Sequence, residues 1–101
     1  MILYSVTVSV DKPYEQEWLD WMSSYFLPKV MSTGKFVEYK MFRLLNAEDE
    51  GATYSIQYFA NTIMDLESYL EQDAPALIQE HFQHFKDKHV AFRTMLEQVE
   101  I

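Results

Sequence analysis

Two histidines, His81 and His84, stand three residues apart in a segment with helical periodicity, so one helix face could present both to a metal ion. Glu80 adds a carboxylate four residues before His84. A catalytic zinc ion takes three protein ligands, and a third is not identifiable unless His89 folds back. The alternative is a helix end where His84 meets solvent and His81 borders an apolar stripe of Leu77, Ile78 and Phe82. We expect this alternative, and therefore neither a metal site nor a resident cofactor.

A second set of polar side chains has the chemistry of a site for a small anionic molecule. Arginine supplies forked donors that match a carboxylate, and hydroxyl and amide groups fix the orientation of a ligand. Arg93 is the main candidate, because a cation in the middle of a strand needs solvent, a carboxylate or an anion. The competing explanations are an ion pair with Glu38 or Glu97 and a hydrated contact between protomers. The predicted ligand-binding set is Ser5, Thr7, Arg43, Gln57 and Arg93.

The formal charge of −8, from 16 acidic and 8 basic side chains, limits the partners. An acidic surface without a dense run of Lys or Arg repels nucleic-acid phosphates and anionic lipids, so we expect neither as a partner. The 101 residues suit one domain spanning positions 1–101. There is no cysteine, and the first ten residues alternate polar and apolar positions, unlike a signal peptide. We expect a cytoplasmic protein.

The segments that would hold these residues alternate between strand and helix. Alternation of polar and apolar residues, with many β-branched and aromatic side chains, is typical of a half-buried strand. A polar stretch ending in glycine, residues 46–51, predicts a hairpin loop between the second and third strands. The strands are predicted at residues 2–10, 36–45, 52–60 and 89–99.

Two helical segments are expected between these strands. Asp11 is placed to cap the first, and Pro28 should bend or end it, because proline lacks the amide hydrogen and clashes with the preceding turn. Thr62 and Asp65 have the spacing of a capping box at the start of the second. Asp73-Ala-Pro75 should interrupt this helix and restart it. The resulting order is β-α-β-β-α-β.

Right-handed crossovers in this order predict an α+β fold with an antiparallel four-stranded sheet and both helices on one face. The other face would be bare, and pairing two such faces in a homodimer would cover it. Strand alternation then assigns the side chains. We expect the helix side to hold Val6, Val8, Tyr54, Ile56 and Phe92. We expect the open side to hold Leu3, Ser5, Thr7, Ser55, Gln57, Phe59, Arg93 and Met95.

Five segments of the sequence resemble an uncharacterised family of short bacterial proteins. The resemblance covers nearly the whole chain and implies the ferredoxin-like arrangement of the dimeric α/β-barrel superfamily, in which two protomers pair their sheets. It implies no particular activity, although the superfamily includes cofactor-independent monooxygenases and haem-degrading enzymes. The segments are Glu17–Met22, Thr33–Phe36, Thr53–Tyr58, Asp73–Pro75 and Val90–Thr94.

Three hypotheses of different classes follow. The first is a homodimer whose barrel binds a small ligand or partner without catalysis. The second is a cofactor-independent enzyme of the monooxygenase or isomerase type. The third is a structural or interaction module whose open face belongs to another protein. A ligand retained in the barrel would separate the first two from the third, and an acid or base beside that ligand would separate the second from the first.

Overall fold

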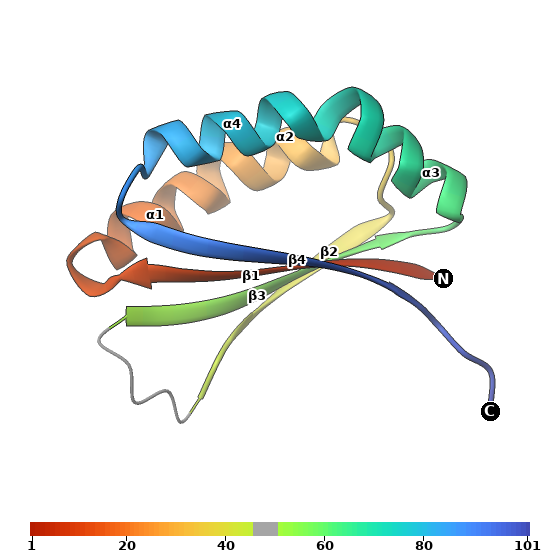
Figure 1. Cartoon of the computed structure of the whole chain (residues 1–101), viewed down its shortest axis with the longest axis horizontal. Helices are drawn as coiled ribbons and strands as arrows, with labels where there is room; N and C mark the ends of the chain where they lie inside the picture. Colours follow the sequence, from red (N-terminus) through yellow and green to blue (C-terminus); the bar gives the residue numbers. More distant parts are fainter. Residues whose placement is uncertain (46–50) are drawn as a thin grey trace.

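The computed structural model describes residues 1–45 and 51–101 (Figure 1). Its four strands are β1 (Ile2–Asp11), β2 (Glu38–Arg43), β3 (Gly51–Ala60) and β4 (His89–Glu97). They pair in the order β2-β3-β1-β4, and every neighbouring pair is antiparallel. The helices of the described ranges lie together on one side of the sheet. The predicted β-α-β-β-α-β order and the two-layer α+β fold are confirmed, whereas the predicted hairpin loop lies largely outside the described residues.

Each of the two crossovers on the helix side is a continuous helical run. The first contains the 3-10 turn η1 (Lys12–Tyr14), α1 (Glu15–Trp21), η2 (Met22–Phe26) and α2 (Leu27–Met31). The second contains α3 (Ile63–Ser68), η3 (Tyr69–Asp73) and α4 (Ala74–His84). None of these helices has both the length and the apolar character that a membrane crossing requires.

One of the two predicted helix caps is present. The hydroxyl of Thr62 accepts a hydrogen bond from the amide of Asp65 at 3.1 Å, which confirms the cap of the second run. Asp11 makes no side-chain cap. It is instead the last residue of β1, where its amide donates to the carbonyl of Lys88 at 2.9 Å. Strand pairing therefore holds Asp11 at the position where the sequence predicted a helix start.

A π-helical turn precedes each of the two prolines that were predicted to disturb the helical runs. The first run does not end at Pro28, whereas the second changes from η3 to α4 at Ala74, in agreement with the predicted interruption and restart. In an α-helix, a proline ring clashes with the carbonyl four residues earlier and leaves that carbonyl without a donor. The segments η2 and η3 are wound in the wider π form, which moves the preceding turn away and lets the helix continue. The residue before each proline donates to a carbonyl five residues earlier, Leu27 to Met22 and Ala74 to Tyr69.

The core lies between the helices and the sheet and is rich in aromatic side chains. Trp18 of α1 is 0% exposed and packs against Tyr54 of β3, which is 3% exposed, with ring centroids 5.1 Å apart. The predicted position of Tyr54 on the helix side of the sheet is confirmed. The other large side chains that are fully buried in this core are Val8, Val10, Met22, Val30, Ile56, Leu66 and Phe85.

The facing of β4 differs from the prediction. Residues directly opposite each other in a sheet share a face, and Val6 lies opposite Arg93 while Thr7 lies opposite Phe92. Arg93 therefore lies on the helix side and Phe92 on the open side, the reverse of the expected assignment, and Met95 likewise belongs to the helix side. The reason is that β4 is an edge strand exposed along most of its length, so its own hydrophobic pattern does not fix its facing.

Replacing Trp18 should test the core. Trp18→Ala is expected to lower the free energy of unfolding by about 3–5 kcal/mol, because a large aromatic truncation leaves a cavity in a packed interior. Urea denaturation measures the change, and Phe82→Ala is the control because Phe82 is 47% exposed on α4. A loss below about 1 kcal/mol for Trp18→Ala, similar to that of an ordinary surface substitution, would contradict the described core.

Candidate functional site

A small cavity lies between the helical layer and the sheet. Its volume is about 30 Å³, which is room for about two water molecules or a single small polar group. Residues from β1, β3, β4, η2, η3 and α4 surround it, so both helical runs and three strands contribute. The lining is mainly apolar, with a few polar side chains among it: Tyr4, Tyr58, Tyr69, His81 and Arg93.

The three tyrosines form one aromatic cluster. Tyr4 on β1 lies 6.0 Å from Tyr58 on β3 and 5.8 Å from Tyr69 on η3, measured between ring centroids. Burial raises the pKa of each phenol above its ordinary value, and for Tyr4 the nearby charge of Arg93 partly opposes this rise. The hydroxyl groups therefore keep their protons at neutral pH and are able to donate hydrogen bonds.

His81 on α4 is held by a hydrogen bond from Trp18 on α1. The indole Nε1–H of Trp18 donates to Nε2 of His81 at 3.0 Å. His81 is 4% exposed, and burial, together with the charges of His89, Arg93 and His84, lowers the pKa of its imidazole from 6.5 to about 3. The imidazole is therefore neutral at physiological pH.

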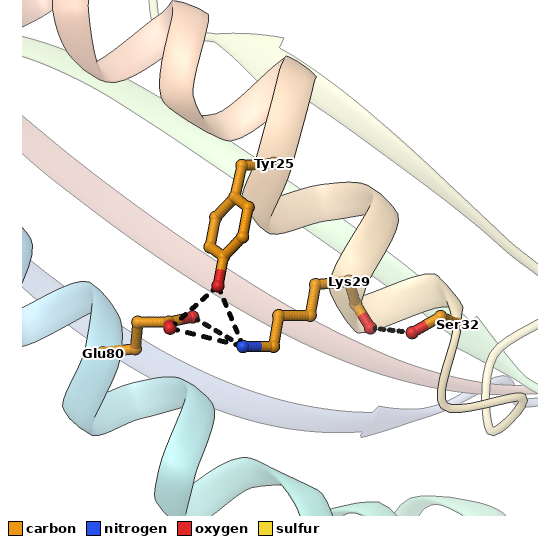
Figure 2. A network of polar contacts seen from close by, with 4 residues as sticks. All are labelled: Tyr25, Lys29, Ser32 and Glu80. Carbon is orange, nitrogen blue, oxygen red and sulfur yellow. Dashed lines mark hydrogen bonds and ion pairs between the residues drawn. The ribbon is translucent and has the colours of Figure 1, made fainter.

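A polar network on the surface joins the two helical runs that cover the cavity (Figure 2). The hydroxyl of Tyr25 donates to the carboxylate of Glu80 at 2.9 Å, and Nζ of Lys29 lies 3.2 Å from the same carboxylate. The hydroxyl of Ser32 donates to the carbonyl of Lys29 at 2.7 Å. Because these groups are largely exposed, the network adds little stability. It connects Glu80 on α4 to Tyr25 and Lys29 of the first helical run.

The structure separates the residues that the sequence predicted as one ligand-binding set. Ser5 and Thr7 on β1 and Gln57 on β3 lie on the open face, where Ser5 is directly opposite Gln57. Arg93 lies on the helix side and lines the cavity. The prediction that these residues share one surface is wrong, because a strand sends alternate side chains to opposite faces.

Arg43 lies away from both groups, at the end of β2. It is opposite Tyr54 and on the helix side of the sheet. Its guanidinium donates to the hydroxyl of Tyr54 at 3.0 Å and lies 3.7 Å from the carboxylate of Glu15. The Tyr54 hydroxyl in turn donates to Glu15. Arg43 therefore has partners within the chain, and a role in ligand binding stays a prediction.

The three histidines lie near one another without converging on a common point. The ring of His84 stacks on Trp21 with centroids 4.6 Å apart, and Nδ1 of His89 lies 2.7 Å from the carbonyl of Phe85. The His81 and His89 rings meet edge to face at 4.5 Å. Within the described ranges, no three His, Asp or Glu side chains form a group that could hold a metal ion.

Sequence reasoning missed the aromatic side of this site. Tyr4, Tyr58 and Tyr69 occupy apolar positions in their elements, so periodicity assigns them to the core and says nothing of their hydroxyls. The contact between Trp18 and His81 could have been predicted from the sequence. Both lie on apolar helix faces, and a buried indole N–H and a buried imidazole each need a hydrogen-bonding partner. Pairing them would have identified the contact.

The sheet order, the one-sided helical layer and the cavity between them define an α+β protein of the ferredoxin-like class. The chain belongs to the family described as a domain of unknown function, DUF4286, whose model matches residues 1–99. The predicted membership of an uncharacterised family is thereby confirmed. No curated protein matches the chain.

Solved structures share this fold at low sequence identity. An EthD family protein from Bacillus halodurans has a TM-score of 0.70 and 10% identity, covering 98% of this chain and 100% of its own. A dimeric ferredoxin-like protein from an uncultured marine organism has a TM-score of 0.66 and 10% identity, covering 100% and 99%. A mutant of SnoaB, a cofactor-independent oxygenase from Streptomyces nogalater, has a TM-score of 0.60 and 10% identity, covering 99% and 95%. The likeness establishes the fold.

Acid should destabilise the protein through His81. Because the folded state resists protonation down to a pKa of about 3 while the unfolded histidine takes a proton below 6.5, stability falls as the pH drops from 6.5 toward 3. Between pH 7 and pH 5 this group should account for a loss of about 2 kcal/mol.

Urea denaturation at the two pH values measures this loss. In His81→Gln the side-chain carbonyl is able to accept from Trp18 but does not titrate, so the variant should lose about 2 kcal/mol less than the wild type between the same pH values. His84→Gln is the control, because His84 is exposed, and it should behave as the wild type. An equal pH dependence in the wild type and His81→Gln would contradict the buried neutral imidazole.

Proposed function

We propose that the protein is a bacterial, cytoplasmic homodimer that binds a small anionic molecule in the cavity between its helices and its sheet. The observation that carries the proposal is the position of Arg93, an exposed arginine that lines an otherwise mainly apolar cavity. None of the ion pairs within residues 1–45 and 51–101 involves Arg93, and Glu38 lies 3.8 Å from Lys40 instead. A structural ion pair of Arg93 with Glu38 or Glu97 therefore lacks support in these ranges.

The charge of the molecule strengthens the case for Arg93. In a chain with a net charge of −8, a guanidinium with no carboxylate partner in the described ranges is a local positive site in a field that otherwise repels anions. The guanidinium fork matches a carboxylate in two parallel hydrogen bonds. The cavity is large enough for the charged group alone. The apolar body of the ligand would therefore lie at the exposed edge, beside Arg93.

The open face of the sheet supports the homodimer. In a single protomer this face exposes large apolar side chains to water, among them Phe92, which is 68% exposed. Exposed apolar surface of this kind, mixed with the polar Ser5, Thr7 and Gln57, is typical of a protein-protein contact. A structural neighbour is itself described as dimeric. The other large apolar residues on this face are Leu3, Phe42, Phe59, Val90 and Leu96.

The dimer can be tested with a matched pair of variants. Phe92→Asp places a charge in the middle of the open face, so sedimentation velocity should change from a dimer to a monomer, because an unpaired charge in an apolar interface is costly. Phe82→Asp makes the same substitution on the exposed side of α4 and should remain a dimer. A wild-type monomer at micromolar concentration, or a dimer that survives Phe92→Asp, would refute the open-face interface.

A cofactor-independent oxygenase is the second candidate, because SnoaB has the same fold. Such a reaction needs a base to ionise the substrate, and a good base has a pKa near the working pH. His81 is a poor base, since its pKa is lowered to about 3, and the three tyrosines have raised pKa values and stay protonated. The residues around the cavity therefore favour binding of an existing anion over its formation.

Arg93 can be tested with benzoate, a small carboxylate with an apolar body. Arg93→Met should weaken benzoate binding by about tenfold or more, since a charge-assisted hydrogen bond is lost, and leave the melting temperature unchanged because the side chain is exposed. Lys86→Met removes an equal charge from a residue that does not line the cavity and should bind benzoate as the wild type does. Isothermal titration calorimetry measures both.

The outcomes separate the three classes of function. A dimer that binds no carboxylate, and that carries no small molecule in native mass spectrometry of freshly purified protein, would favour the interaction module over a ligand-binding protein. Binding that is lost equally in Arg93→Met and Lys86→Met would reflect overall charge and not the cavity. Oxygen uptake in the presence of a bound phenol would favour the oxygenase.

A further inference from the structure

The hydrogen bond between Trp18 and His81 determines which nitrogen of the imidazole carries the proton. An indole N–H is a donor only, so Nε2 of His81, which receives it at 3.0 Å, must be unprotonated. A neutral imidazole has one N–H, which is then on Nδ1. Because the ring is neutral at physiological pH, His81 has one nitrogen occupied as an acceptor and the other available as a donor.

The Nδ1–H group has no acceptor among residues 1–45 and 51–101. The one hydrogen bond of the His81 side chain in these ranges is that with Trp18. The same part of the chain contains no fully buried side-chain nitrogen or oxygen that lacks a partner. Nδ1 therefore keeps a small accessible surface, although His81 as a whole is 4% exposed. His81 lines the cavity, so an Nδ1–H group with accessible surface is within reach of a group bound there.

The remaining polar groups around the cavity are also donors. Arg93 has no acceptor atom, and the hydroxyls of Tyr4, Tyr58 and Tyr69 keep their protons, so each of them can donate although its oxygen can also accept. Neither a carboxylate nor a side-chain amide lines the cavity within the described ranges. Because Nδ1–H of His81 and the Arg93 guanidinium can only donate, and a buried donor without an acceptor costs free energy, a ligand group that brings acceptors satisfies this lining best.

We propose that Trp18 is a positioning residue that holds His81 as a hydrogen-bond donor toward the cavity, and that the cavity therefore selects ligands by an oxygen-centred anion, a carboxylate or a phenolate. This inference rests on the proposed ligand-binding function. It adds a second anion contact to Arg93 and explains why an indole is placed against an imidazole in the core. It also predicts which ligands bind more weakly, namely those whose polar group donates hydrogen bonds.

The tautomer of His81 can be measured without any ligand. Nitrogen NMR of the histidine rings distinguishes Nδ1–H from Nε2–H, and wild-type His81 should be protonated on Nδ1 alone. Trp18→Phe removes the donor and keeps an aromatic ring, so His81 should then populate both tautomers. An Nε2–H tautomer in the wild type would overturn the proposal, whether or not a ligand binds.

Ligand selectivity gives the second readout. The wild type should bind benzoate more tightly than benzamide, whose amide hydrogens would face donors, by about tenfold or more. Para-nitrophenolate binding can be followed by visible absorbance. If the site accepts a phenolate, para-nitrophenolate should bind as tightly as benzoate. If the site is specific for carboxylates, benzoate should bind and para-nitrophenolate should not. His81→Leu should lose most of the preference for benzoate, and His81→Gln should keep it, because its amide is able to accept from Trp18 and donate to the ligand.

These readouts separate failure of this inference from failure of the proposed function. The pair His81→Leu and His81→Gln remains informative if Trp18→Phe does not fold. Equal affinity for benzoate and benzamide in the wild type, or an unchanged preference in His81→Leu, would overturn the selectivity while leaving the cavity as a binding site. Absence of binding by all three probes would remove the ligand-binding function and with it the selectivity, and the NMR result would stand as a structural property alone.

Discussion

The register of β1 with its two neighbours is the constraint on which the rest of the structure depends. β1 pairs with β3 on one side and β4 on the other, and these pairings place Tyr4 opposite Tyr58 and Val6 opposite Arg93. A shift of one residue would move every side chain of the strand to the opposite face. The cavity would then lose Tyr4 and its apolar wall, and the polar open-face residues of β1 would meet the helices.

The helix order, the antiparallel sheet and the burial of Trp18 were predictable because each rests on a strong local pattern. β1 and β3 alternate cleanly, and helical spacing in the first run places its aromatic residues on one face. The facing of β4 was not predictable in the same way. Both parities of this edge strand are exposed, and its partner, not its own sequence, decides where Arg93 points.

The candidate site shows a similar division. Arg93 was identifiable because a mid-strand guanidinium needs a charged or aqueous environment wherever it faces. Its neighbours were not identifiable, because they come from five other elements and meet only in the folded chain. Ser5, Thr7 and Gln57 were grouped with it by chemistry, and the pleat of the sheet separates them. The polar residues that line the cavity with Arg93 are instead three tyrosines and a histidine. The protonation state of each depends on its burial, which cannot be read from the sequence.

The two π turns have a consequence for how this chain is aligned with its homologues. Each turn accommodates one residue more than an α-helix of the same length, and each lies directly before a helix that has a proline at its start. A homologue could lack one residue of η2 or η3. Its strands, and the helix residues that face the core, would then keep the positions they have in this chain. Gaps between family members therefore belong at these turns, and a gap placed elsewhere would rotate the assigned faces of Val30 or Leu77 out of the core.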